Sequence, residues 1–164
     1  MPNWCDNRVR VEANTKAKMT EFRNFVKSQV DGEAFSFDSV VPMPKELKGT
    51  SSPAKILTQE EYDNYVTHHE YTGNPITKAM QDKFIEQYGA DNWYDWANTN
   101  WGCKWEVDNV EVSVEDDTET EYYFQTAWCP PEGVYHALVK RFPDLYISWF
   151  YDEVNMQFAG YLPN

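Results

Sequence analysis

The chain is poor in the residues that build metal and redox sites. Its 164 residues include three His and three Cys, and no two Cys stand in the close spacing of a common zinc motif. A site that combines all three thiolates with a histidine is the alternative. We interpret Cys5, Cys103 and Cys129 as small core hydrophobes, because each lies beside or near a Trp. The sequence therefore predicts no metal and no cofactor.

Long apolar runs are also absent. No apolar stretch approaches the length of a membrane span, and the N-terminus has no apolar segment of the kind found in secretory signals. Three unclustered cysteines do not suggest a disulfide framework. We therefore expect a protein of a reducing cytoplasm.

Basic residues are scarce relative to acidic ones. Lys and Arg number 14 against 27 Asp and Glu, which gives a formal net charge of −13. This excess disfavours direct binding to nucleic acid or to anionic membranes, because both are bound through Lys and Arg. A basic surface, such as the DNA-binding face of another protein, would be attracted. A plainer alternative is that the charge only keeps the protein soluble.

No catalytic constellation can be assembled from the sequence. Nucleophilic catalysis by Cys or Ser needs a base, and Cys129 with His136 is the only near pair. The adjacent His68 and His69 could bind a metal, but no third ligand is evident. We therefore predict a protein that is not an enzyme.

Aromatic residues are abundant, at 7 Trp, 11 Tyr and 9 Phe, and they predict a packed core. Trp and Cys occur together in three stretches, residues 1–5, 100–105 and 126–131. Because both residue types are readily buried, we expect these stretches to meet in one core. On that reading, Trp128→Ala should cost on the order of 3–5 kcal/mol of folding free energy.

Hydrophobic spacing predicts a mixed α+β chain. Alternating apolar residues indicate strands, and apolar residues three or four apart indicate helices. The strands are expected over 8–12, 34–40, 110–114, 122–128, 145–151 and 156–160, and the main helices over 15–30, 58–66, 77–88, 93–101 and 131–142. The order strand, helix, strand, strand, helix, strand is the ferredoxin-like plan, an antiparallel sheet with helices on one face. We expect a single domain, 1–164, with a mostly helical insert over 45–105 and an extra C-terminal strand.

Several motifs together give the chain a family resemblance. It resembles the YubB-type ferredoxin-like family of phage and conjugative-plasmid proteins, whose function is not established. The motifs are Pro2–Cys5 with Asn7, the segment 35–44 ending Val-Pro-Met-Pro, Tyr94–Trp96, Asn100–Gly102 with Lys104 and Trp105, Thr126–Trp128 with Pro130 and Pro131, and Phe158–Gly160. The resemblance implies a ferredoxin-like fold and a mobile-element origin. It implies no iron–sulfur cluster, for which three unclustered Cys would not suffice.

Two groups of residues are candidate sites. The first is the acidic tip of the hairpin expected over 110–128, where a solvated turn is the alternative; it comprises Glu115, Asp116, Asp117, Glu119 and Glu121. The second is a pocket of aromatic rings with a few polar groups, suited to a planar ligand such as a nucleotide base. It comprises Asn3, Trp4, Asn100, Trp101, Lys104, Trp105 and Trp128, with Asn7 and Thr126 nearby in the motifs. For the Asn residues, capping of turns is the alternative.

These features lead to two functional hypotheses. The first is a non-enzymatic phage or mobile-element accessory protein in the host cytoplasm that binds a host protein with a basic surface. Its concrete form is an acidic anti-defence inhibitor that mimics DNA. The second is a small-ligand protein that binds a nucleotide in the aromatic pocket.

Overall fold

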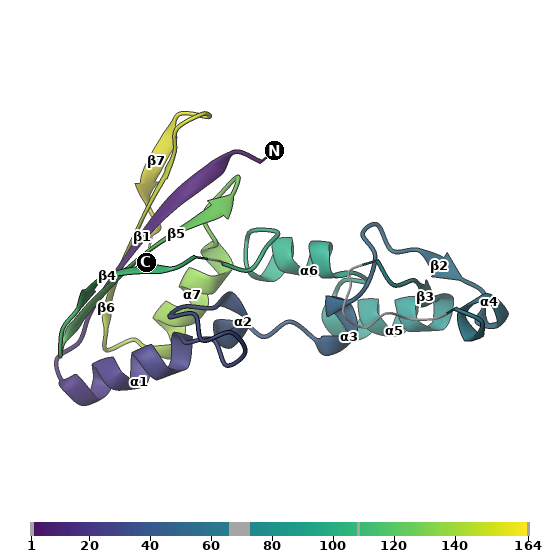
Figure 1. Cartoon of the computed structure of the whole chain (residues 1–164), viewed down its shortest axis with the longest axis horizontal. Helices are drawn as coiled ribbons and strands as arrows, with labels where there is room; N and C mark the ends of the chain where they lie inside the picture. The colour runs from purple at the N-terminus through teal and green to yellow at the C-terminus, as the bar shows by residue number, and fades with distance from the viewer. Residues whose placement is uncertain (1, 66–72, 108, 164) are drawn as a thin grey trace. The chain divides into compact units, whose positions relative to one another are not determined.

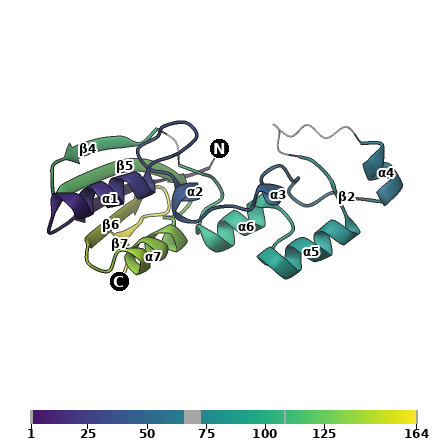
Figure 2. The ribbon, with the colours of Figure 1, turned by 90° about the horizontal axis from the view of Figure 1, so that it is seen from below.

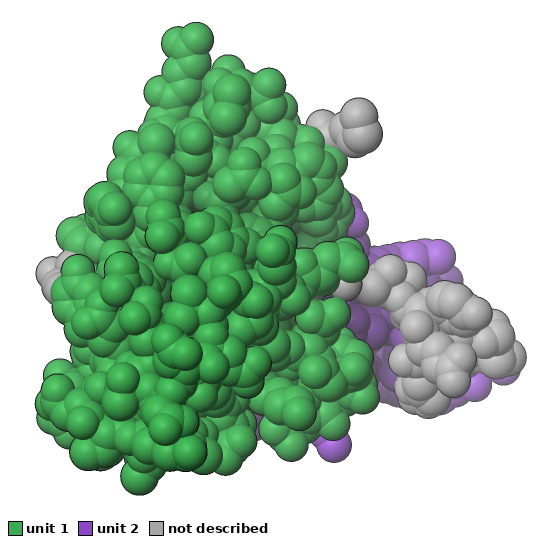
Figure 3. Space-filling model, turned by 60° about the vertical axis from the view of Figure 1, so that its left-hand side comes forward, with its two compact units in different colours: residues 1–42, 100–164 green, residues 43–99 purple. Residues whose placement is uncertain are grey.

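The computed structural model describes residues 2–65, 73–107 and 109–163. The chain forms two compact units, one of residues 1–42 and 100–164 and one of residues 43–99, which Figure 3 colours separately. None of the described helices has both the length and the apolar character needed to cross a bilayer. The first unit contains the sheet and the candidate site.

The first unit is built on a five-stranded antiparallel sheet in the order β4-β5-β1-β6-β7 (Figure 1). Its strands are β1 (Trp4–Glu12), β4 (Glu111–Glu115), β5 (Glu119–Ala127), β6 (Tyr146–Glu153) and β7 (Phe158–Tyr161). β1 is central and pairs with β5 on one side and β6 on the other. Its side chains alternate strictly between exposed and buried, as expected for a sheet with one covered face.

Helices α1 (Lys16–Val26) and α7 (Glu132–Arg141) cover the same face of this sheet (Figure 2). The elements β1, α1, β4, β5, α7 and β6 give the strand order β4-β5-β1-β6, and β7 extends the sheet at the β6 edge. This is the ferredoxin-like plan with one added strand, so the predicted fold class is confirmed. The opposite face of the sheet carries the exposed side chains of β1.

Aromatic rings fill the space between the sheet and the helices. Trp149 is fully buried, and its ring lies within 6.0 Å of the rings of Phe35, Phe124 and Tyr135. The apolar stripes of α1 and α7 pack here, with Met19, Phe22, Val26, Val134 and Leu138 buried. Pairs at this separation and inclined at 80–84° add edge-to-face attraction to the burial of apolar area.

The strand predicted over 34–40 is wrong. Residues 37–40 form the short helix α2 (Phe37–Val40), and the hairpin of β4 and β5 supplies both middle strands of the fold. Ser36 caps the helix by accepting a hydrogen bond from the Ser39 N–H, and the Glu106 carboxylate accepts from the N–H groups of Phe37 and Asp38. Phe35 and Phe37 are buried as the apolar pattern predicted, but Ser36 between them is buried as well, so the alternation of residue types does not correspond to a strand with one exposed face.

The helix predicted over 15–30 is shorter than expected. Thr15 caps its start, as predicted, but α1 ends at Val26 and the side chain of Val30 is 94% exposed. The chain turns away because the carbonyl of Val26 accepts a hydrogen bond from the Ser36 N–H. Ser28 then binds the N–H groups of Val30 and Asp31 with its hydroxyl, which is turn geometry.

The second unit spans 43–99, whereas the sequence predicted an insert over 45–105. Its elements are α3 (Lys45–Lys48), β2 (Ile56–Leu57), α4 (Gln59–Asp63), β3 (Ile76–Thr77), α5 (Lys78–Tyr88) and α6 (Trp93–Asn100), the last residue of which belongs to the first unit. The predicted capping box of Thr58 and Glu61 is present. Gly89 ends α5 in the left-handed conformation, with φ of 73°. His68 and His69 lie outside the described residues.

Candidate functional site

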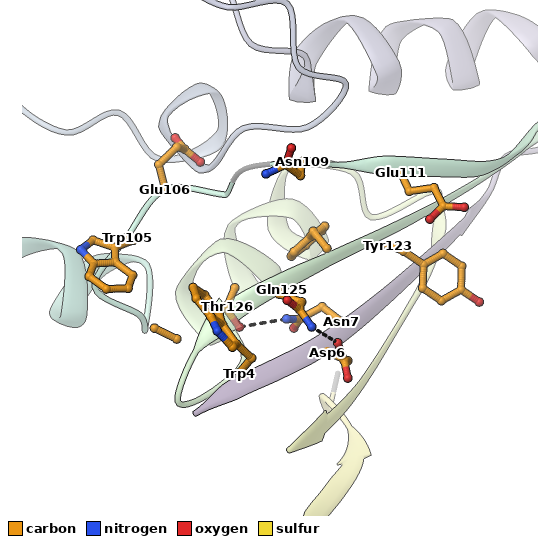
Figure 4. Close-up of a pocket in the computed structure, with 12 residues that line it drawn as sticks. Trp4, Asp6, Asn7, Trp105, Glu106, Asn109, Glu111, Tyr123, Gln125 and Thr126 are labelled. Atoms are coloured by element: carbon orange, nitrogen blue, oxygen red, sulfur yellow. Dashed lines mark hydrogen bonds between the residues drawn. The ribbon is translucent and has the colours of Figure 1, made fainter. Parts of the chain in front are cut away.

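A groove opens in the first unit beside the C-terminal half of β5; we call it the β5 groove. It arises because the ladder between β4 and β5 ends at the pair Glu111 and Tyr123, so that residues 124–127 of β5 continue past β4. Its volume is about 780 Å³. Figure 4 shows its lining, which consists of Trp4, Asp6, Asn7, Trp105, Glu106, Asn109, Glu111, Tyr123, Phe124, Gln125, Thr126 and Ala127.

Aromatic rings line much of the groove. Trp4 and Trp105 are 43% and 41% exposed, and their ring centroids lie 6.3 Å apart at an inclination of 39°. Tyr123 is also exposed. The ammonium group of Lys104 lies 3.8 Å from the ring centroid of Trp105, which is a close cation–π contact. The Trp105 ring therefore already attracts a cation from its own chain.

The polar lining of the groove is acidic. It includes the carboxylates of Asp6, Glu106 and Glu111, and no Lys or Arg is among the described lining residues. Asp6 accepts a hydrogen bond of 2.8 Å from the side-chain amide of Gln125. Burial raises the pKa of the Glu106 carboxyl above its ordinary value, although the N–H groups that it binds oppose this shift. The groove therefore suits positive or neutral groups better than anions.

Asn7 and Thr126 line the base of the groove but serve the fold. The Asn7 side chain donates to the Thr126 hydroxyl and to the Cys5 carbonyl, and it accepts from the Trp149 indole N–H. The Thr126 hydroxyl in turn donates to the Cys129 carbonyl. These groups have their partners inside the protein, so they do not offer free bonding capacity to a ligand.

The structure divides the predicted pocket residues. Trp4 and Trp105 line the groove, and Lys104 stacks on Trp105. Trp101 is instead buried, and its indole N–H donates to the Val41 carbonyl at 2.8 Å. The sequence analysis grouped Trp101 with the pocket because a motif alone does not distinguish a Trp side chain buried in the core from one that lines a groove.

The remaining predicted pocket residues lie outside the lining. Asn3 accepts a backbone hydrogen bond from the Trp128 N–H. Asn100 ends α6, and its carbonyl lies where a side chain on Gly133 would have to go. Trp128 directly follows β5 and has a φ of 75°, which is not a strand conformation. Its side chain therefore does not lie on the buried face of the sheet with that of Phe124.

Trp128→Ala is therefore expected to cost about 1–2 kcal/mol rather than the loss expected of a fully buried Trp. The side chain is 45% exposed, so truncation removes less buried area and leaves little cavity. Chemical denaturation of the variant and of Trp101→Ala, whose ring is buried, measures the contrast. A larger loss for Trp128→Ala than for Trp101→Ala would contradict this assignment.

Sequence reasoning missed eight lining residues: Asp6, Glu106, Asn109, Glu111, Tyr123, Phe124, Gln125 and Ala127. For the strand residues a signal was available. Asp6 has the same parity as Trp4 on β1, and Gln125 has the same parity as Tyr123 on β5, so each pair shares a face. The approach of Asn109 to β5 depends on the path of the chain, which no local pattern encodes.

The acidic hairpin is less free than predicted. Glu121 is buried and accepts from Arg8 at 2.9 Å and from Ser113 at 2.8 Å, so its placement on a solvated tip is wrong. Glu119 pairs with Arg10 at 2.9 Å, and Asp117 pairs with Lys16 at 3.0 Å. Glu115 and Asp116, both exposed, are left as the hairpin carboxylates without an ion pair among the described residues.

The three cysteines gather at the same end of the sheet as the groove. Cys5 and Cys103 are buried and Cys129 is half-buried, with its thiol donating to the Gly102 carbonyl at 3.0 Å. Burial raises the pKa of Cys5 to about 12 and raises the pKa of Cys129. Among the described residues no hydrogen bond joins Cys129 to His136, and no group of His, Cys, Asp and Glu is arranged to hold a metal ion.

Comparisons with known proteins support the fold. Residues 100–163 match the family model described as the ferredoxin-like domain in Api92-like protein. The crystal structure of protein Api92 from Yersinia pseudotuberculosis is similar over 98% of this chain and 93% of that chain, with a TM-score of 0.53 and 10% identity. At this identity the likeness shows the fold alone. No curated protein matches the chain.

Proposed function

We propose that this protein is a non-enzymatic binding protein that attaches to a basic surface of another protein. The observation that carries the proposal is the acidic lining of the β5 groove, in a chain whose net charge is −13. Charge of one sign steers oppositely charged partners toward a surface and disfavours wrong partners. The aromatic walls add contact area that a simple charged surface lacks.

The motif resemblance supports a more specific version of this proposal. A phage or mobile-element accessory protein in the host cytoplasm would meet host proteins with nucleic-acid-binding surfaces. An acidic domain that occupies such a surface acts as a DNA mimic, and anti-defence inhibition is the biological form that we propose. If so, duplex DNA should release the protein from its target in competition.

A second candidate function is the binding of a neutral planar ligand on the indoles. The exposure of Trp4 and Trp105, whose rings lie close to each other, favours it, because an exposed ring face can stack on a flat group. The carboxylates of Asp6 and Glu111 would repel the phosphates of a nucleotide, so a nucleoside or free base fits this groove better than the nucleotide suggested by the sequence.

A charge-neutralisation experiment tests the leading proposal. The probe is a fluorescent peptide of nine arginines, and its affinity for the wild-type protein should fall steeply between low and physiological salt. Asp6→Asn with Glu111→Gln should weaken binding about three- to tenfold, mainly through slower association, since each exposed pair is worth up to about 1 kcal/mol. Stopped-flow anisotropy measures both rates.

The matched control removes two negative charges from the second unit instead, by Glu60→Gln with Glu86→Gln; both residues are exposed. It should change the affinity by less than about twofold, because the charges lie outside the site. Salt-insensitive binding would reject a charge-driven interaction. A larger loss for Glu115→Gln with Asp116→Asn than for the groove variant would move the site to the hairpin.

A further inference from the structure

We propose that the β5 groove binds an extended, arginine-containing segment of the partner, which pairs with the edge of β5 at Gln125 and places its guanidinium group against Trp105. This inference rests on the proposed function and specifies the chemistry of the partner. Three features of the groove support it: the exposed strand edge at Gln125, an aromatic and acidic wall, and the position of Lys104.

The first feature is the strand edge itself. The Trp128 N–H donates to the Asn3 carbonyl at 2.9 Å, which continues the ladder between β5 and β1. In an antiparallel ladder successive residues direct their main-chain groups to opposite sides. Gln125 and Ala127 therefore direct their N–H and C=O groups away from β1, beyond the point where the ladder with β4 ends at Tyr123. Ala127 is only 4% exposed, so the accessible part of this edge lies at Gln125, which is exposed.

The outer edge of β4 is a poorer place for strand addition. β4 exposes Glu111, Ser113 and Glu115, and its register shifts between Val112 and Val114. Charges and bulges are the devices by which proteins block edge pairing. β5 at Gln125 has no such protection, since Gln125 is exposed and uncharged and the strand there is regular. A peptide strand can add at such an edge through main-chain hydrogen bonds.

The second feature is the wall that would receive the side chain. Trp105 and Trp4 present flat rings, and the carboxylates of Asp6 and Glu111 stand in the same lining (Figure 4). Glu111 stands beside Tyr123, at the other end of the lining from Trp105 (Figure 4), so the carboxylates attract the cationic segment as a whole and the ring receives the side chain. A planar guanidinium group stacks on an aromatic ring better than an ammonium group does. The groove should therefore prefer arginine to lysine at the position that meets Trp105.

The third feature is Lys104, whose ammonium group lies 3.8 Å from the Trp105 ring centroid. A second cation at this ring meets a like charge, so Lys104 opposes the binding of arginine. Removing that charge should strengthen the binding of a cationic segment. An anion-binding pocket predicts the opposite, because Lys104 would then be the residue that holds the ligand.

The experiment uses a nine-residue peptide of alternating Thr and Val with one central arginine. Matched peptides carry lysine or the neutral isostere citrulline at the centre, and two further versions carry N-methyl groups on one or the other set of alternate residues. Titrations are followed by the indole N–H signals of the full-length protein. The Trp4 and Trp105 signals should shift, and the buried Trp149 signal should not.

We expect arginine to bind several-fold more tightly than lysine, and citrulline at least about tenfold more weakly than arginine. Trp105→Ala should lose about tenfold in affinity, and Lys104→Met should gain about threefold. Only one of the two N-methylated sets should lose binding, because only one set of N–H groups faces β5. Tyr146→Ala, on β6 away from the groove, should bind as the wild type does.

Other results would overturn the inference. Equal binding of arginine and citrulline, weaker binding by Lys104→Met, or equal tolerance of both N-methyl patterns each contradicts it. If adenosine shifts the two indole signals and the arginine peptide does not, the groove is a planar-ligand site. If the nine-arginine peptide still binds in a salt-dependent way, the proposed function stands while this inference fails; if neither peptide binds, the proposed function fails.

Discussion

Gly133→Ala is expected to lower the free energy of unfolding by about 3 kcal/mol, in the upper part of the range for overpacked sites. A Cβ atom at this position would overlap the Asn100 carbonyl oxygen and lie 2.8 Å from the carbonyl carbon. Both are backbone atoms, so no side chain can rotate away. The Gly133 N–H also donates to the Trp101 carbonyl at 3.1 Å, which ties the first turn of α7 to the loop at 100–102.

The sign of the stability change caused by Gly133→Ala shows whether steric overlap or helix propensity dominates at this position. Gly133 lies inside α7, where alanine would favour the helix by about 1 kcal/mol if nothing else mattered. Gly160→Ala is the matched control, because its Cβ would meet only the hydroxyl end of Tyr151, at 3.3 Å. Urea denaturation of the two variants measures the difference. A Gly133→Ala protein as stable as the wild type would show that the two segments do not approach as closely as described.

This contact also gives a physical reason for two of the motifs. The Asn-Trp-Gly stretch at 100–102 and the Pro-Pro stretch at 130–131 pack against each other where α7 begins. Gly102 has φ of 90°, and a Cβ there would lie 2.9 Å from the Glu132 backbone nitrogen. The loop at 100–102 and the first turn of α7 therefore each need a glycine at the crossing, Gly102 and Gly133, and this requirement explains part of the motif without any ligand.

Much of the fold could be predicted from the sequence because its elements follow regular periods. The alternation from Arg8 to Glu12 and the apolar stripe from Met19 to Val26 each report which face is buried. Local rules failed where a distant residue decides the structure. Glu106 stabilises the start of α2, almost seventy residues earlier in the chain, and converts an apparent strand into a helix.

The candidate site was less predictable than the fold. Motif residues such as Trp4 and Trp105 were found because they are aromatic and close to polar residues. Their separation from Trp101, which is buried, depends on how the loop at 100–105 turns, and no period describes that turn. The charges were misjudged because cross-strand neighbours are not visible in the sequence: the register of β5 on β1 places Arg10 opposite Glu121 and Arg8 diagonal to it, and Glu121 pairs with Arg8.

The second large effect is expected at Asn7, which is 1% exposed and lies at the centre of β1. Its side-chain amide joins three elements, through the Thr126 hydroxyl at 2.9 Å, the Trp149 indole N–H at 3.0 Å and the Cys5 carbonyl at 3.0 Å. A buried amide with several of its bonds made contributes modestly to stability, but its removal leaves the buried Trp149 indole N–H without its partner. It also takes one hydrogen bond each from the Thr126 hydroxyl, which keeps its bond to the Cys129 carbonyl, and from the Cys5 carbonyl.

Asn7→Leu should therefore lower the free energy of unfolding by about 3–4 kcal/mol, since each buried group that loses its partner costs about 1–3 kcal/mol. The control is Gln125→Leu, which removes an exposed amide on the neighbouring strand and should cost less than about 1 kcal/mol. Trp149→Phe removes the orphaned indole N–H, so the double variant with Asn7→Leu should lose less than the sum of the single losses. Additive losses would mean that the indole N–H gains nothing from Asn7. The Asn7 side chain would then contribute to stability only by filling space. Its presence in the motif would need another explanation, such as contact with a ligand in the β5 groove.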